Sequence, residues 1–432
     1  MRGFNTLLFV LFALSANAAD GTLGTVSVQK GNNVSVNGEA PLSLTLDGKD
    51  HQNCQFLSKR APDESHEFTW KEVTTTRGGE LAEILGDQLR SVDSLVVKGY
   101  VNDKDFHAMW DASLYGYLSV INLKNAVLEN NAVPDTAFFH ENEQYEGSSH
   151  EIFYYIGLRK IILPEGLEKI GEGAFYQASA LRQVNFPSTL RYIGDFAFNA
   201  TKLEMNQLVI PEGVEEINQY AFAFCRKLKA QVTLPSTIKK IGEWAFYGCP
   251  ITSINLPEGL ESLGSLAFWD CDLREVSIPS SCHEFNEGWQ FGFNRNLEKM
   301  HLPEGMTEIP DHFAVDCFRL REVNFPHTLK HIGEKAFSLC MSLKNVELPL
   351  GMQSLGEEAF SELEALEQIV FPASMKSLGK NSCSYWKNIK RIYCAAMEPP
   401  VCDPTDGGVF SGFDFPDGFD TPVVYIPKGT IN

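Results

Sequence analysis

One sequence motif recurs along the middle of this chain and restricts its fold more than any other feature. It reads Leu-x-x-Ile-x-Leu-Pro, then x-x-Leu-x-x-Ile-Gly, then x-x-Ala-Phe-x-x-Cys. The prolines that close the first segment of the copies are Pro164, Pro187, Pro211, Pro235, Pro257, Pro279, Pro303, Pro326, Pro349 and Pro372. A period in the low twenties is typical of a solenoid, in which each coil packs only on its neighbours. The sequence therefore predicts stacked coils rather than a compact globule.

Each copy of the motif also predicts the local structure of one coil. In residues 181–187 apolar and polar residues alternate with the period of a β-strand, and the proline that follows ends the strand. Gly194 is expected to allow a bend, and Asp195–Phe198 is expected to form a helical or 3₁₀ turn that buries Phe198. A single coil cannot offset the conformational entropy of its residues, so the stack is the folding unit.

The repeat resembles the BspA-like leucine-rich repeat. The cleanest copy runs Leu-Arg-Glu-Val-Asn-Phe-Pro-His-Thr-Leu-Lys-His-Ile-Gly-Glu-Lys-Ala-Phe-Ser-Leu-Cys from Leu320 to Cys340, and the match covers about Leu158 to Tyr393. The resemblance implies an α/β repeat solenoid, a strand-rich leucine-rich-repeat coil with N- and C-terminal caps. It also implies a protein that is exported or displayed on a bacterial surface and that acts as an adhesin toward host matrix proteins or other cells.

The segments outside the array predict the remaining organisation. Arg2, the apolar run Leu7–Leu14 and the small-x-small sequence ending at Ala18 predict a signal peptide, and Ala19 after the cut argues against a lipoprotein. We expect a signal peptide over 1–18, a β-rich lead-in or small module over 19–78, an N-terminal cap and irregular first repeat over 79–157, the array of about ten turns over 158–394, and a C-terminal loop and closing strand over 395–432.

Charge limits the partners that the chain can bind. The 432 residues carry a formal net charge of −20, from 36 basic and 56 acidic residues. Nucleic acids and anionic lipids repel such a protein, so neither is an expected partner. We expect no membrane insertion once the signal peptide is removed, and an exported location in the periplasm, on the cell surface or outside the cell.

The ten cysteines predict a packed column more than a disulfide framework. Five of them occupy one slot, eight residues after the Ile or Leu of the second segment: Cys225, Cys249, Cys271, Cys317 and Cys340. In other copies Ala178, Thr201, Phe293 and Leu363 are assigned to that slot, which suits a small buried hydrophobe. Outside the column, Cys394 and Cys402 are the best candidates for a disulfide, but free thiols remain the alternative.

The solvent-facing residues of the strands form the predicted binding face. In the middle turns these residues are rich in amide and hydroxyl side chains, in the C-terminal half they are charged, and they form no aromatic stripe. A merely solvated sheet is the alternative interpretation. The residues that we expect to contact a partner are Asn185, Thr233, Asn255, Ser277, Lys299, His301, Glu322, Asn324 and Glu347.

Motifs for catalysis or metal binding are weak. His327 and His331 lie on bent chain, and the neighbours Cys282 and His283 would point apart, so neither pair predicts a site. The copy containing Cys282–Phe293 departs from the repeat, either by drift or as a local site. The acidic loop with Asp403, Asp406, Asp414, Asp417 and Asp420 is expected to be a solvated turn, with weak Ca²⁺ binding as the alternative.

These observations favour a binding or adhesion scaffold for an extracellular protein or glycan, without cofactor or metal and without enzyme activity. Two other functions stay open. The array can be the targeting arm of a secreted enzyme system, or a purely structural spacer at the cell surface. A repeat scaffold changes partner by surface substitution, so the sequence does not name the ligand.

Overall fold

The computed structural model describes residues 66–139, 156–402, 408–411 and 422–427, together with four short N-terminal strands. Those strands form two antiparallel pairs, β1 (Gly24–Gln29) with β2 (Asn33–Gly38) and β3 (Leu44–Leu46) with β4 (Lys49–His51). The predicted signal peptide, the polar insertion at 140–155 and the five loop aspartates lie outside the described residues.

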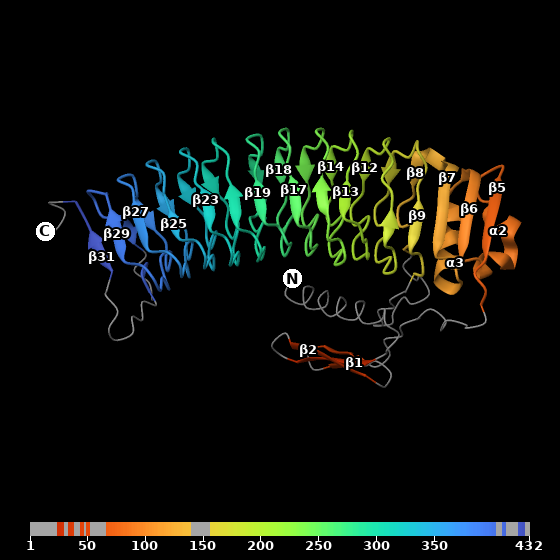
Figure 1. Ribbon diagram of the computed structural model, residues 1–432, viewed down its shortest axis with the longest axis horizontal. Coiled ribbons are helices and arrows are strands. Elements are labelled where there is room, and N and C mark those ends of the chain that lie inside the picture. Colours follow the sequence, from red (N-terminus) through yellow and green to blue (C-terminus); the bar gives the residue numbers. More distant parts are fainter. Residues whose placement is uncertain are drawn as a thin grey trace.

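The repeats form a coil whose turns follow one another along the long axis of the molecule (Figure 1). The first side of the coil carries parallel strands in four runs, β5 to β11, β13 to β17, β19 to β23 and β25 to β31. Their bounds are β5 (Trp70–Thr75), β6 (Ser94–Val101), β7 (Val120–Leu128), β9 (Lys160–Ile162), β11 (Gln183–Val184), β13 (Gln207–Val209), β15 (Gln231–Thr233), β17 (Ser253–Asn255), β19 (Glu275–Ser277), β21 (Lys299–His301), β23 (Glu322–Asn324), β25 (Asn345–Val346), β27 (Gln368–Phe371), β29 (Arg391–Cys394) and β31 (Val423–Tyr425). The parallel solenoid predicted from the repeat is confirmed.

The second side carries two-residue strands, also parallel, in two sheets. One sheet runs from β8 to β20 and the other from β22 to β30. The strands are β8 (Ala132–Val133), β10 (Lys169–Ile170), β12 (Tyr192–Ile193), β14 (Glu216–Ile217), β16 (Lys240–Ile241), β18 (Ser262–Leu263), β20 (Glu284–Phe285), β22 (Glu308–Ile309), β24 (His331–Ile332), β26 (Ser354–Leu355), β28 (Ser377–Leu378) and β30 (Val401–Cys402). The motif glycine follows them because coils approach closely there: a Cβ on Gly264 would lie 2.4 Å from the backbone nitrogen of Glu243.

The third side is a run of turns and not the helical or 3₁₀ turn predicted for residues 195–198. Successive N–H groups alternate in direction. The N–H of Trp244 donates to the carbonyl of Ser265 in the next coil (2.9 Å), whereas the N–H of Ala245 donates back to Gly242 in its own coil (3.3 Å). This alternation needs left-handed residues, and Trp244 and Gly248 have φ of 58° and 66°. The third side therefore bonds the coils together, which a helix could not do.

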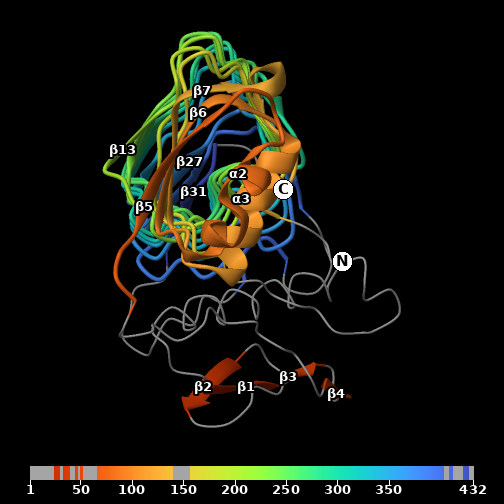
Figure 2. The ribbon, with the colours of Figure 1, turned by 90° about the vertical axis from the view of Figure 1, so that its right-hand side faces the viewer.

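Two helices lie at the N-terminal end of the coil (Figures 1 and 2). They are α2 (Leu81–Leu85), which continues as the 3₁₀ helix η2 (Gly86–Ser91), and α3 (Asp103–Tyr115), and a short 3₁₀ helix, η3 (Glu129–Asn131), precedes β8. The buried carboxylate of Asp105 accepts hydrogen bonds from the N–H groups of Gly79 (2.7 Å) and Leu81 (2.9 Å). The predicted order of helix, strand and helix is present, but a capping role for these helices stays a prediction.

A column of phenylalanines fills the core behind the third side. Each ring stacks on the next, with centroids 5.2 to 5.6 Å apart and interplanar angles of 12° or less. The members are Phe138, Phe175, Phe198, Phe222, Phe246, Phe268 and Phe291, and each is fully buried. Burying an aromatic side chain stabilises the fold by about 2 kcal/mol or more, and stacked pairs add to that.

The predicted cysteine column is confirmed and has a second role. All five thiols are buried and free, and each sulfur lies within hydrogen-bond distance of a carbonyl in the preceding coil. The pairs are Cys225 with Phe198 (3.2 Å), Cys249 with Phe222 (2.9 Å), Cys271 with Phe246 (3.3 Å), Cys317 with Phe291 (3.3 Å) and Cys340 with Ala314 (3.3 Å). The slot thus favours a weak donor as well as a small hydrophobe. The other candidate pair, Cys394 and Cys402, consists of free thiols in the structure.

The coil containing Cys282–Phe293 carries a one-residue insertion. Glu287 and Gly288 absorb it with φ of 50° and 80°, and a Cβ on Gly288 would lie 2.0 Å from the carbonyl oxygen of Asp311. The slot assigned to Phe293 is therefore filled by Asn294, whose Nδ2 donates to the Phe268 carbonyl (2.7 Å). That correction follows from the insertion, which shifts every later position of the coil by one residue.

Candidate functional site

The predicted binding residues lie on the first side of the coil, which we call the strand face. In β13, β15, β17 and β19 the central side chain is buried and the flanking two point outward. Parallel pairing aligns these outward residues in rows, so Thr233 lies beside Asn255, and His301 beside Asn324. Eight of the nine predicted residues are exposed and His301 is half-buried: Asn185, Thr233, Asn255, Ser277, Lys299, His301, Glu322, Asn324 and Glu347.

Two members of the strand face also bind the neighbouring coil. The amide of Asn185 accepts from the N–H of Leu163 (2.7 Å) and donates to its carbonyl (3.0 Å). Asn324 makes the same pair of bonds to Leu302, at 2.9 and 3.0 Å. These side chains extend the backbone ladder by one step, so their presence has a structural explanation that does not require a ligand.

The charged part of the strand face is internally paired. The Nζ of Lys299 lies 3.2 Å from a carboxylate oxygen of Glu322, and the Nε2 of His301 lies 3.3 Å from a carboxylate oxygen of Glu275. Pairs this exposed contribute little to stability, typically less than about 1 kcal/mol. Because these side chains are largely exposed, they remain available to a partner.

The third side carries an aromatic surface that sequence reasoning missed. An outward position lies two residues before the inner core position, which is phenylalanine in the first five of these coils and Ala314 in the sixth. It holds Phe196, Tyr220, Trp244, Leu266, Trp289 and His312 in successive coils. Phe196 stacks on Tyr220 (centroids 4.7 Å apart) and Tyr220 on Trp244 (5.2 Å). The repeat itself carries the signal, because this position is Phe, Tyr or Trp in four of these six coils.

A second row of rings adjoins the first. Phe224, Tyr247 and Trp269 belong to a hydrophobic cluster separate from the main core. Trp269 contacts Trp289 and Phe293, with centroids 5.2 and 4.5 Å apart. Six half-buried rings make up the aromatic band: Phe196, Tyr220, Trp244, Trp269, Trp289 and Phe293.

Burial also shifts the pKa values of ionisable groups in and beside the band. Desolvation, followed by the charge of Glu243, raises the pKa of Tyr220 to about 12. Desolvation likewise raises the pKa of Tyr247 to about 12 and raises the pKa of the Asp316 carboxyl above its ordinary value. The rings are therefore neutral at physiological pH, and the band presents apolar edges beside carboxyl groups.

The weak catalytic candidates stay apart in the structure. Burial, followed by the charge of Glu284, raises the pKa of Cys282 to about 12, which opposes a nucleophilic thiolate. The exposed His283 lies with Nδ1 2.7 Å from the carbonyl oxygen of Ser281. His327 and His331 contact different groups, the carboxylate of Glu304 (3.0 Å) and the hydroxyl of Ser354 (2.6 Å). Within the described residues no group of three metal-binding side chains gathers.

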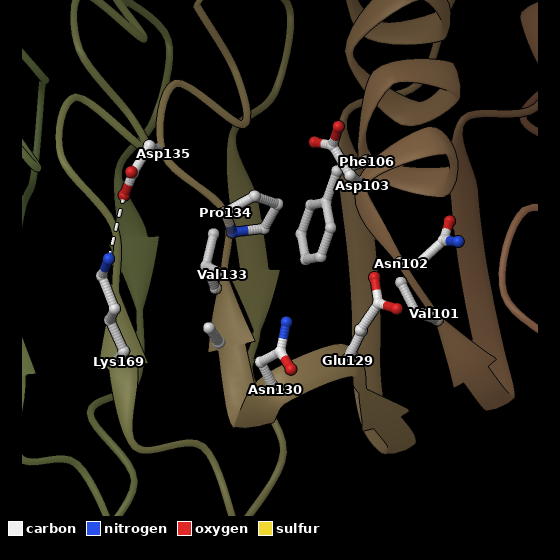
Figure 3. A pocket seen from close by; sticks show the side chains of 11 residues that line it. Val101, Asn102, Asp103, Phe106, Glu129, Asn130, Val133, Pro134, Asp135 and Lys169 are labelled. Carbon is white, nitrogen blue, oxygen red and sulfur yellow. Dashed lines mark ion pairs between the residues drawn. The ribbon is translucent and has the colours of Figure 1, made fainter.

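A cleft of about 320 Å³ lies where the N-terminal helices meet the first coils (Figure 3). Val101, Phe106 and Val133 supply apolar walls. Lys169 and Asp135 form an ion pair at its edge, with 3.2 Å between nitrogen and oxygen. None of the residues predicted to contact a partner lines this cleft, so the structure separates it from the strand face.

Comparison with known proteins places these features in a family. The family model described as "BspA type Leucine rich repeat region (6 copies)" matches residues 148–231, 229–338 and 312–397. Among curated proteins none matches the sequence. None of the described helices has the length and apolar character needed to cross a bilayer.

Solved structures of repeat proteins are also similar. A leucine-rich repeat protein from Bacteroides ovatus is 23% identical, with a TM-score of 0.44, covering 70% of this chain and 82% of its own. A leucine rich cell surface protein from Faecalibacterium prausnitzii is 20% identical, with a TM-score of 0.35 and coverages of 65% and 84%. The pneumococcal vaccine antigen PcpA is 18% identical, with a TM-score of 0.36 and 95% coverage of both chains.

Proposed function

Because this chain belongs to the BspA-type leucine-rich repeat family, we propose that it is an exported binding scaffold that holds an extracellular protein or glycan against the strand face. One observation carries the proposal. The outward residues of the strand face form aligned, exposed rows over many coils, so a large partner can make many simultaneous contacts with a preformed surface. Export is supported by the leader-like sequence at 1–18, and adhesion by the family resemblance.

The first step of the test is to find the partner. A glycan array and a pull-down with host matrix proteins, both using the purified mature protein, cover the two proposed partner classes. A protein that captures nothing in either experiment contradicts the proposal and favours the structural spacer. Substrate turnover that disappears when residues 19–78 are deleted would instead favour the enzyme-linked alternative.

The second step locates the contact. Lys299→Glu and Glu322→Lys each break the ion pair between them, and we expect each to weaken partner binding about tenfold while leaving the melting temperature unchanged. The double variant Lys299→Glu with Glu322→Lys restores the ion pair with the two charges exchanged. It tests whether binding depends on which of the two positions carries the positive charge. Lys239→Glu, an exposed charge beside the second side, is the matched control. If both strand-face variants bind as the parent does, the strand face is not the site.

A further inference from the structure

The aromatic band and its surrounding charges form a surface unlike the strand face. The rings lie on the third side in adjacent coils, and Tyr220, Trp244 and Trp269 pack against a cluster distinct from the main core. Half-buried apolar side chains that gather in one contiguous surface patch mark a place of contact with another molecule. The question is therefore which kind of partner these rings and their neighbours would fit.

Carboxylates flank the band, and several of these carboxylates belong to no ion pair. Glu243 accepts hydrogen bonds only from neutral groups, the Nε1 of Trp244 (3.0 Å) and the Nε2 of Gln219 (3.2 Å). Asp195 accepts from the backbone N–H of Gln219 (3.0 Å), and Asp311 from that of Glu334 (2.6 Å). In the described part of the chain these carboxylates contact no Lys or Arg, so their negative charge is uncompensated.

Two basic side chains near the band, Arg226 and Arg295, already have partners. Arg226 pairs with Asp270, with 2.9 Å between nitrogen and oxygen. The guanidinium of Arg295 lies over the rings of Phe293 and Phe318, 5.7 and 5.8 Å from their centroids. Glu287, two residues before Trp289, is exposed and adds another carboxylate to the rim. The balance at the band is therefore apolar and negative.

This chemistry excludes several partners. Nucleic acids and a second copy of this chain, whose net charge is −20, would be repelled. A sugar ring stacks on the face of an aromatic ring, but the faces of Phe196, Tyr220 and Trp244 already contact one another at interplanar angles of 7° and 16°. Ring edges and carboxylates remain exposed, and these suit apolar side chains and cations.

We propose that the aromatic band is a second interaction surface, which binds a basic amphipathic segment of another protein. Apolar side chains of that segment pack on the ring edges, and its Lys or Arg side chains pair with Glu243, Glu287 and the neighbouring carboxylates. The surface lies on a different side of the coil from the strand face, so the two can be occupied together. Charge complementarity selects the partner and accelerates its association.

Synthetic peptides test the two halves of the proposal with the full-length mature protein. A decapeptide of alternating Lys and Leu is titrated calorimetrically against two matched decapeptides, alternating Lys and Ser, and alternating Glu and Leu. We expect the Lys–Leu peptide to bind at least about tenfold more tightly than either, because only it offers both charge and apolar surface. Equal binding of the Lys–Ser peptide would show that the rings make no contact, and would overturn the proposal.

Variants then locate the surface. Glu243→Lys with Glu287→Lys is expected to weaken Lys–Leu binding at least about tenfold. The control, Glu215→Lys with Glu261→Lys, changes the net charge equally at two exposed positions beside the second side of the coil, and we expect it to stay within about twofold of the parent. If both double variants lose the same affinity for the Lys–Leu peptide, the peptide responds only to the net charge of the protein, and the proposal is overturned.

A neutral variant keeps the test valid if the reversal harms folding. Glu243→Gln with Glu287→Gln retains side-chain acceptors and removes the charge, so it should weaken the Lys–Leu peptide in the same direction without lowering the melting temperature. Unchanged binding by this folded variant would also overturn the proposal. Binding of the peptide should be indifferent to Lys299→Glu, which separates this surface from the strand face.

Discussion

Trp244 and Phe246 lie two residues apart in the same coil, yet they belong to different environments. Phe246 is fully buried and stacks on Phe222 and Phe268, with interplanar angles of 3° and 7°. Trp244 is half-buried and stacks on Tyr220 at 16°. Both side chains stack on rings of adjacent coils. A comparison of their contributions to stability therefore separates the effect of burial from that of stacking.

The repeats show what each column tolerates. The inner position is phenylalanine in nearly every coil, since only a large apolar ring fills the core between adjacent coils. The outer position changes along the chain, through Gly173, Phe196, Tyr220, Trp244, Leu266, Trp289, His312, Lys335, Glu358 and Asn381. The fold does not require rings at the outer position, so their concentration in neighbouring coils calls for another explanation, which the aromatic band supplies.

Alkaline pH should produce the largest contrast between inner and outer groups. Burial raises the pKa of the core thiols Cys249, Cys271 and Cys340 well above 9.0, the ordinary value. The unfolded thiols ionise first, so the stabilisation is complete below pH 9 and is lost as the pH rises above it. We expect roughly 1.4 kcal/mol lost per thiol per pH unit. Urea midpoints at pH 7.5, 9.5 and 10.5 measure this loss.

The control for the pH experiment replaces Cys249, Cys271 and Cys340 by Ala. This variant is less stable at neutral pH but should lose less stability between pH 9.5 and 10.5. Tyr220 and Tyr247 of the outer rows, with pKa values of about 12, contribute in the same direction only above pH 10. If the urea midpoint of the parent protein stays constant up to pH 10.5, burial does not raise the pKa of these thiols and the prediction is wrong.

Phe246→Ala tests the inner column directly. Removing a fully buried ring leaves a cavity between the rings of Phe222 and Phe268, and we expect a loss of about 3 to 5 kcal/mol in the free energy of unfolding. Urea denaturation followed by circular dichroism measures it, provided that a single transition is retained. A loss below about 1 kcal/mol would mean that the column does not hold the coils together.

Trp244→Ala makes the matching change in the outer row. The ring loses its stacking on Tyr220 and part of its buried area, so we expect a loss of about 1 to 2 kcal/mol. The same denaturation experiment gives the ratio of the two losses. If Trp244→Ala costs as much as Phe246→Ala, the outer ring is structural and the comparison fails.

Cys249→Val should have the smallest effect. The replacement keeps an apolar side chain of similar size but removes the S–H donor that lies 2.9 Å from the Phe222 carbonyl. That carbonyl still accepts from the N–H of Cys225 (3.2 Å), so we expect a loss of about 1 kcal/mol. Thermal unfolding measures it, with Cys249→Ser as the variant that keeps a donor. A larger loss for Ser than for Val would assign the slot to apolar packing alone.

The structural features that recur in every repeat could be predicted from the sequence. Each copy of the motif predicts one coil, the alternation of its first segment predicts which strand residues point outward, and the phenylalanine and cysteine positions predict the core. The third side was misread because its turns depend on bonds between coils and on left-handed residues such as Trp244, which no local pattern reveals. Asn294 was missed because one inserted residue displaced the register of its coil. The role of Asn185 also required coordinates, since its partner lies in the preceding coil.

The inserted residue at Glu287 and Gly288 has a mechanical consequence. The sheet of the second side stops at β20 and resumes at β22, and the regular ring stack ends where Phe291 meets Phe313 edge-on at 75°. The first side stays paired at the same place, where β19 is hydrogen-bonded to β21, and on the third side the N–H of Phe291 donates to the carbonyl of Phe313 (2.9 Å). Under tension along the coil, the two halves should therefore separate first on the second side and stay hinged on the other two.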